Sequence, residues 1–315
     1  MAKQREIPEV DIVIDEAAGV IREVKPEKTH LRSKKGHERR VNASIYAVLT
    51  VMSIVWLLPF VFLVLQSFRS YLTESGGMVN YLIPKRFSLD NYRYLFEDGQ
   101  FFRWYGNTLV IALVCAVVQT LMVLSVSYTL SRMRFRGRKF LMNMILVLGM
   151  FPGFLTMIAL YFLLKQLGLT QAGAIPGLIL IYCASSGMGY YISKGFFDTI
   201  PKSLDESARI DGASRYQVFK KIIMPLSKPI VIYTVLMAFM APWGDYVFAS
   251  YVALGRTDSY NVAVGLYRWV NTNDYQGFFT RFCAGGVLVA IPITALFLML
   301  QKYYVEGVTG GAVKG

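Results

Sequence analysis

The residues best suited to bind a partner lie in a polar stretch at 200–225, IPKSLDESARIDGASRYQVFKKIIMP, between two strongly apolar runs. Its spacing predicts two short helices. Ser203 and Glu206 have the spacing of a capping box, in which two side chains satisfy free backbone N–H groups of a first helical turn. Ser214 and Gln217 repeat that spacing further along. The stretch therefore predicts a helix–turn–helix whose boundaries are set by local side chains.

Gly212 lies between the two predicted helices, where a residue without a Cβ atom readily adopts the left-handed backbone that ends a helix. The second helix is expected to run to Met224, because Pro225 disfavours helical geometry in the residue before it. The local pattern leaves three interpretations: a solvated loop, a docking platform for a soluble partner, or a DNA-binding helix–turn–helix. The apolar runs on either side disfavour the third.

No motif for chemical catalysis accompanies this segment. The sequence lacks G-x-x-x-x-G-K-[ST], so we predict that the chain does not hydrolyse nucleotide by a P-loop, and H-E-x-x-H and G-x-S-x-G are also absent. The cysteines lie in apolar runs and are interpreted as small buried hydrophobic residues: Cys115, Cys183 and Cys283. His30 and His37 lack a second ligand pair. We therefore predict no catalytic residues, no metal site and no cofactor, and a membrane enzyme is disfavoured.

Asp245 is the one acidic residue placed inside a predicted membrane span. An acid within a bilayer is costly and is a functional candidate by default, so Asp245 and its neighbour Trp243 are candidate residues of a transport pathway. A hydrated structural role for Asp245 is an equal alternative. Pro242 and Gly244 predict a kink or widening of the helix at this point.

The segment 267–279, YRWVNTNDYQGFF, alternates aromatic residues with amides and an acid, and we expect it to be a loop. Aromatic rings pack on the C–H faces of sugars while amides bond hydroxyl groups, so the loop is a candidate contact for a carbohydrate or its carrier. An aromatic belt at the membrane interface is the alternative. The candidate residues are Tyr267, Trp269, Asn271, Asn273 and Tyr275.

The elements that must position these residues are membrane helices. Hydrophobic residues make up 55% of the 315-residue chain, which excludes an ordinary soluble domain. A span needs about 20 residues to cross the hydrocarbon core. Five stretches between charged residues are long enough: 40–69, 103–132, 139–165, 165–194 and 281–302. A further span starts at Lys228, meets Asp245 and is expected to end near Leu254, so the sequence predicts six. The first is expected to remain as an anchor, because about forty mostly polar residues precede it and no signal-peptide pattern is present.

Basic residues predict the orientation of these spans. The formal net charge is +13, and the short loop 132–139 holds five basic residues and no acid. The connection 194–228 holds seven basic residues against four acids. Because basic loops stay in the cytosol, we predict a cytosolic N-terminal arm at 1–40, a cytosolic 200–225 segment and a cytosolic C-terminal tail at 303–315.

The polar segment resembles the EAA motif, E-A-A-x3-G-x9-I-x-L-P, of ABC importer permease subunits. The spacing matches throughout, and the sequence departs from the motif at Ser207 and Met224. The residues that carry the match are Glu206, Ser207, Ala208, Gly212, Ile222, Met224 and Pro225. The resemblance covers most of 41–315, leaves 1–40 outside, and is greatest to the shorter permease subunit of maltose-type oligosaccharide importers.

This resemblance implies an all-α polytopic membrane protein with six transmembrane helices and the type I ABC importer permease (MetI-like) fold. It implies a sister permease subunit in a heterodimer, two ATPase subunits, an external solute-binding protein, the lipid bilayer and no nucleic acid. The chain itself would be no enzyme, because the partner subunits hydrolyse ATP. The implied function is the passage of a maltose- or maltodextrin-like oligosaccharide across the bacterial plasma membrane.

The resemblance also assigns roles to residues. The ATPase-coupling set would be Glu206, Ser207, Ala208, Asp211, Gly212, Ile222 and Pro225. The C-terminal tail, with Gly310, Gly311 and Lys314, would contact the ATPase, and the 267–279 loop would enter the sugar cleft of the binding protein. The alternative function is a stand-alone ion-coupled secondary carrier, motivated by Asp245. The lack of an internal repeat argues against it, and the sugar itself is not identified, with galacto-oligosaccharides second to maltodextrins.

Overall fold

The computed structural model describes residues 12–15, 20–23, 29–70, 83–271 and 275–310, and the chain divides into two compact units, 1–61 and 62–315. The first unit contains an antiparallel pair of strands, β1 (Ile12–Asp15) and β2 (Val20–Glu23), in which Ile12 lies opposite Glu23. It also holds most of helix α1 (Thr29–Ser67), which contains the first predicted span up to residue 67. The predicted arm at 1–40 thus includes both strands and the start of α1.

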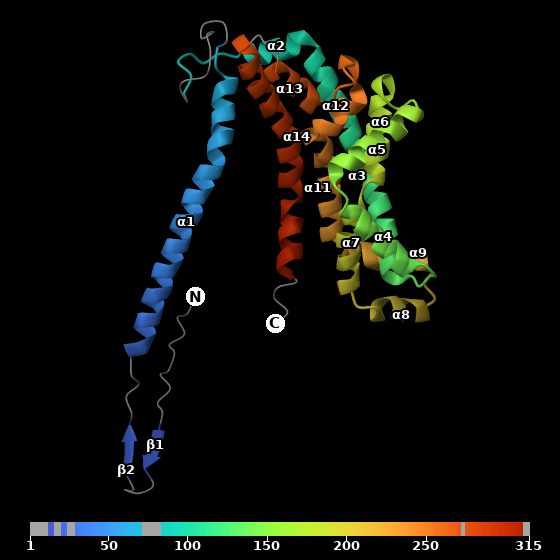
Figure 1. Cartoon of the computed structure of the whole chain (residues 1–315). Coiled ribbons are helices and arrows are strands. Elements are labelled where there is room, and N and C mark those ends of the chain that lie inside the picture. The colour runs from blue at the N-terminus through green and yellow to red at the C-terminus, as the bar shows by residue number, and fades with distance from the viewer. Residues whose placement is uncertain (1–11, 16–19, 24–28, 71–82, 272–274, 311–315) are drawn as a thin grey trace. The chain divides into compact units, whose positions relative to one another are not determined.

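The described part of the second unit is helical, as the sequence predicts (Figure 1). Three single-turn or widened segments interrupt the α-helices: η1 (Gln171–Gly173), the π-helix η2 (Phe219–Ile223) and η3 (Thr257–Ser259). The α-helices are α2 (Asp90–Asp98), α3 (Gln100–Arg132), α4 (Arg138–Gly149), α5 (Gly153–Gln166), α6 (Ala174–Ala184), α7 (Gly187–Thr199), α8 (Ser203–Ile210), α9 (Arg215–Val218), α10 (Met224–Leu226), α11 (Lys228–Gly244), α12 (Val247–Ala253), α13 (Val262–Asn271) and α14 (Tyr275–Gly310).

Four helical segments in the described residues are long and apolar enough to cross a membrane: Arg39–Ser67, Gln100–Arg132, Gln171–Thr199 and Phe279–Lys302. Two bent pairs raise the number to six if each is one span. The first pair, α4 with α5, bends by 103° around Pro152, whose extended backbone (ψ 118°) starts α5. The second pair joins 215–226 to α11 with a bend of 81°. The six predicted spans agree with this upper number.

The fifth span differs from its prediction. Its apolar run extends to 254, but α11 ends at Gly244 and a separate helix, α12, begins at Val247. Asp245 between them has an extended backbone (φ −80°, ψ 96°). Proline weakens a helix by removing a hydrogen bond and glycine by its backbone freedom, so Pro242 and Gly244 favour a full break over the predicted kink.

Helix α3 is the central element of the second unit and packs against α6, α7, α11 and α13. Toward the α12–α13 end of α3, Trp104 packs with Trp269 (5.3 Å between ring centroids) and donates a 2.9 Å hydrogen bond to the carbonyl of Thr257. Toward the α8–α9 end, a separate buried cluster surrounds Tyr128 and Phe197 and includes Ala208 of α8 and Val218 of α9. One long helix therefore connects two distinct packing centres.

The approach of α13 to α3 depends on Gly265. A Cβ atom at this position would lie 2.0 Å from Cε3 of the buried Trp104 indole.

We expect Gly265→Ala to lower the apparent melting temperature of the purified protein by about 5 °C, because overpacking a core outweighs the better helix propensity of alanine. Gly106→Ala in α3 is the matched control, since no atom lies within 4 Å of its Cβ position, and its melting temperature should be unchanged or higher. Equal melting temperatures for both variants would contradict this packing.

Candidate functional site

The turn between α8 and α9 has the predicted local structure. Gly212 adopts φ +81°, the left-handed conformation expected at the end of the first helix. The second capping box is confirmed: the Gln217 N–H donates to Ser214 Oγ (3.3 Å), and the Ser214 N–H donates to Gln217 Oε1 (2.7 Å). The start of α9 is therefore fixed by its own side chains.

The first predicted capping box, at Ser203 and Glu206, is wrong. Helix α8 begins at Ser203 itself, its N-cap is Lys202, and no side chain caps it. The backbone already turns at Pro201, whose carbonyl accepts from the Leu204 N–H (3.3 Å), while the Lys202 carbonyl accepts from Glu206 (3.1 Å). Because these carbonyls use the free N–H groups of the first turn, the Ser203 hydroxyl is not needed as a cap.

Pro225 does not end the second helix, contrary to prediction. The helical path continues through η2 and α10 to Leu226, and the 81° bend to α11 follows at Ser227. A proline inside an α-helix removes a hydrogen bond and crowds the carbonyl four residues earlier, here that of Lys221. The π-helix at 219–223 is wider than an α-helix and changes the register immediately before Pro225. The widened turn thus accommodates the ring without a break.

The turn and the two helices surround a hollow of about 360 Å³. It is lined by Ala208, Asp211, Gly212, Ala213, Gln217, Lys221 and Ile222. Four of the seven residues predicted to couple the chain to an ATPase lie here: Ala208, Asp211, Gly212 and Ile222. The other three, Glu206, Ser207 and Pro225, are exposed outside the hollow. The fold thus brings together positions from both helices.

Exposed apolar side chains flank this hollow. Ile210 is 86% exposed and Tyr216 is 67% exposed, although both belong to a charged segment. The ammonium of Lys220 lies over the Tyr216 ring, 5.8 Å from its centroid. Exposed large apolar groups within a polar rim are typical of protein–protein contact surfaces. Sequence reasoning overlooked Ile210 and Tyr216, although each is conspicuous as an apolar residue among charged neighbours.

Helix α8 is joined to the membrane helices through Arg132, the last residue of α3. Arg132 Nε lies 3.3 Å from Asp205 Oδ2, and the two side chains are only 5% and 13% exposed. Arg132 Nη2 also donates to the carbonyls of Phe197 (3.0 Å) and Ile200 (2.7 Å) at the end of α7. A single guanidinium therefore contacts α7, the 200–202 link and α8.

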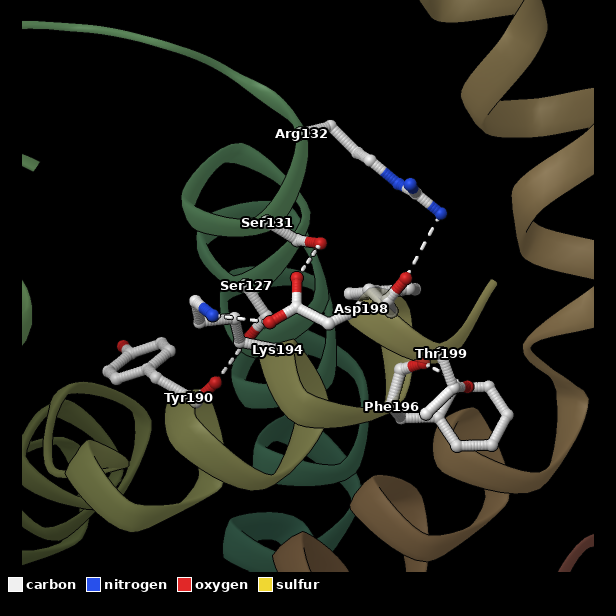
Figure 2. Close-up of polar contacts among 9 residues, drawn as sticks. Ser127, Ser131, Arg132, Tyr190, Lys194, Phe196, Asp198 and Thr199 are labelled. Atoms are coloured by element: carbon white, nitrogen blue, oxygen red, sulfur yellow. Dashed lines mark hydrogen bonds and ion pairs between the residues drawn. The ribbon is translucent and has the colours of Figure 1, made fainter. Parts of the chain in front are cut away.

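Further polar contacts fasten α3 to α7 beside Arg132 (Figure 2). Ser131 Oγ donates to Asp198 Oδ1 (2.6 Å), while Lys194 forms an ion pair with the same carboxylate. Four residues before Ser131 on α3, Ser127 Oγ donates a hydrogen bond to the Tyr190 carbonyl (3.0 Å). The sequence analysis missed the bonds of Ser131 to Asp198 and of Ser127 to Tyr190, because the partners in each lie more than 60 residues apart and no local pattern links them.

Asp245, the candidate pathway acid, has defined partners within the chain. Its carboxylate accepts a hydrogen bond from the Tyr182 hydroxyl and another from the Phe248 N–H (3.0 Å). The amide of Asn261 donates to the Asp245 carbonyl (2.7 Å) and to that of Pro242 (3.2 Å). These contacts stabilise the break between α11 and α12, which gives Asp245 a structural role. Trp243 is 4% exposed and lies within this chain's own core.

The predicted loop at 267–279 is mostly helical, because α13 extends to Asn271 and α14 begins at Tyr275. Trp269 is 7% exposed and packs on Phe101 and Trp104, while Tyr267 is 45% exposed and lies 4.1 Å from the Tyr246 ring. Asn273, Gly311 and Lys314 lie outside the described residues. For Asn271, Tyr275 and Gly310 only the helical backbone is described.

Comparisons with known proteins agree with this architecture. A solved bacterial ABC transporter involved in the import of the acidic polysaccharide alginate has a chain of the same fold, with a TM-score of 0.72 and 22% identity over 85% of this chain and 98% of that chain. The galactooligosaccharides transport system permease protein GanQ of Bacillus subtilis is 38% identical over 275 residues, covering 86% of this chain and 94% of that protein. The maltodextrin transport system permease protein MdxG of the same organism is 36% identical, with 86% and 95% covered.

The family match has its own bounds within the chain. Residues 122–309 match the family described as binding-protein-dependent transport system inner membrane component. They include the last third of α3, the bent spans and the whole 200–225 segment. The chain therefore belongs to this family, and it is a membrane-integral permease of the ABC importer type.

Proposed function

We propose that this chain is the permease subunit of an ATP-driven oligosaccharide importer, and that segment 200–225 docks onto a separate ATPase. The observation that carries the proposal is the hollow formed by α8, the Gly212 turn and η2, which gathers four residues of the predicted ATPase-coupling set. The exposed Ile210 and Tyr216 beside it provide the apolar contact area that a partner would bury.

The full transporter contains a sister permease subunit, two ATPase subunits and a solute-binding protein outside the membrane. It lies in the bacterial plasma membrane, with the N-terminus, segment 200–225 and the C-terminus in the cytosol. The excess of basic residues in 132–139 and 194–228 supports this orientation. The tail residues Gly310, Gly311 and Lys314 contact the ATPase, and the 267–279 region faces the binding protein.

Coupling works as a shift between two conformations of the permease. ATP closes the ATPase subunits, the docked α8 moves with them, and the spans change from inward-facing to outward-facing. Arg132 transmits this movement, because its guanidinium contacts α8 while belonging to α3. Each partner must bind the two conformations with different affinity, because a ligand that binds both equally well does not change their relative populations.

The transported substrates are oligosaccharides, maltodextrins first and galacto-oligosaccharides second. Several similar proteins are named as maltodextrin transport permeases, and the galactooligosaccharides permease GanQ is 38% identical to this chain. The alternative hypothesis of a stand-alone ion-coupled carrier was motivated by Asp245 inside a predicted span. It is less favoured, because the carboxylate of Asp245 accepts hydrogen bonds from Tyr182 and Phe248 that hold the helix break.

The first test changes the Gly212 turn. Gly212→Val places a β-branched residue at φ +81°, a conformation that costs such a residue on the order of 1–3 kcal/mol. We expect binding-protein-dependent sugar uptake to fall at least about tenfold and less ATPase to co-purify. Gly212→Asn is the matched control, because asparagine tolerates the left-handed region, and it should retain most uptake. Normal ATP-driven uptake in the valine variant would refute the docking role.

The second test breaks the ion pair that holds α8. Asp205→Ala leaves the buried Arg132 guanidinium without its carboxylate, a change that costs about 3 kcal/mol. We expect limited trypsin digestion after Arg209 and Arg215 to speed up by at least about tenfold, because α8 detaches more often. Uptake should fall while ATP hydrolysis persists. Asp211→Ala removes an exposed acid at the end of the same helix and is the control, so it should digest at the wild-type rate. Equal digestion rates for wild type, Asp205→Ala and Asp211→Ala would show that Arg132 does not hold α8 for coupling.

The third test addresses the substrate. The complete transporter is reconstituted in liposomes with its solute-binding protein, and ATP-dependent uptake of labelled maltotriose is measured. We expect unlabelled maltodextrins to compete most strongly, galacto-oligosaccharides less strongly, and free glucose weakly. Competition by galacto-oligosaccharides alone would reverse the proposed order of substrates, and competition by neither class would refute an oligosaccharide substrate of these kinds.

A further inference from the structure

A second site lies in the turn between α3 and α4, at residues 134–140, RFRGRKF, which we call the basic turn. Gly137 takes φ +90° there, and α4 begins immediately after it. Helix α4 packs against α7, at the end of the molecule where α8 and α9 lie (Figure 1). The basic turn is separate from the hollow of the coupling segment, with which it shares no lining residue.

The basic turn borders an open hollow of about 580 Å³, larger than the coupling hollow. It is lined by Arg134, Phe135, Gly137, Arg138, Lys139, Phe140 and Met142. Phe140 is 69% exposed and Phe135 is 39% exposed, while Arg134 and Lys139 are exposed beside them. The hollow therefore combines cationic side chains with large apolar surfaces.

Three of the four cations of the basic turn have no acidic partner among the residues that the structure describes, and the fourth, Arg138, interacts electrostatically with Asp198. No Asp or Glu occurs from Met133 to Phe197, and Arg134, Arg136 and Lys139 make no ion pair with any described residue. The next acid, Asp198, is already bound by Lys194 and Ser131. A cluster of unpaired cations around one hollow favours an anionic ligand.

We infer that the basic turn binds the phosphate headgroup of an anionic phospholipid. The turn links α3 to the bent pair α4 and α5, both of which have the length and composition of membrane spans, so we expect it at the membrane–water boundary. Basic pockets in this position bind anionic headgroups, and exposed Phe135 and Phe140 suit the boundary with the acyl chains. A water-soluble phosphate would use the cations alone and leave both rings exposed. The inference depends on membrane integration and does not depend on the coupling role of 200–225.

Charge alone orients a membrane protein, whereas a binding site also needs its apolar walls. The test therefore changes charge and wall separately in the purified complete transporter. Native mass spectrometry measures the affinity for phosphatidylglycerol and for phosphatidylcholine. We expect wild type to prefer phosphatidylglycerol, and Arg134→Gln with Lys139→Gln to bind it about 30-fold more weakly, since each cation near the surface contributes to the attraction. Lys202→Gln with Arg215→Gln removes equal charge from exposed positions at the N-cap of α8 and at the start of α9, and should retain wild-type binding.

A second variant, which changes an apolar side chain of the hollow, keeps the inference testable if the Arg134→Gln, Lys139→Gln protein inserts poorly into the membrane. Phe140→Ser leaves every charge in place, and it should weaken phosphatidylglycerol binding about tenfold. Equal binding of the two lipids by wild type, or wild-type phosphatidylglycerol affinity in both variants, would overturn the inference. Inorganic phosphate that displaces the lipid at equal affinity would also overturn it, because the site would then recognise free phosphate.

Discussion

The placement of the polar segment depends on one buried cation at the end of an apolar helix. A guanidinium stays charged at any physiological pH, so burying Arg132 to 5% exposure requires partners for that charge. The structure supplies the carboxylate of Asp205 and the carbonyls of Phe197 and Ile200. All three belong to the α7–α8 connection. The position of α8 relative to α3 is therefore specified by electrostatics at a single point.

Apolar packing reinforces this polar joint. Ala208 of α8 and Val218 of α9 lie in the same buried cluster as Tyr128 and Phe197, so the segment has an inner face bound to its own membrane helices. Its outer face presents the hollow and the exposed Ile210. A segment held this way moves as a body with the end of α3. Such rigidity suits a part that passes a displacement to the spans.

Local sequence patterns predicted the features that depend on neighbours in the chain. The apolar runs, the left-handed Gly212 and the box of Ser214 with Gln217 all follow from local hydrophobicity or the satisfaction of nearby N–H groups. The box at Ser203 failed because the turn at 201–202 satisfies those groups first. The pair of Arg132 and Asp205 was beyond such reasoning, since its partners are separated by 72 intervening residues and only the packing of α3 against α7 brings them together.

The break at Asp245 shows why an acid in a membrane span need not be an energy-coupling residue. A broken helix in lipid leaves backbone groups that must find partners inside the protein. Asn261 supplies them to the carbonyls of Pro242 and Asp245, while the Asp245 carboxylate accepts from Phe248 at the start of α12 and from Tyr182. Both oxygens of this carboxylate therefore help to hold the break together. The structure thus gives each oxygen of the Asp245 carboxylate a donor from within the chain, whereas Ile210 and Tyr216 of segment 200–225 remain exposed. That contrast favours an energy source that enters from outside the chain.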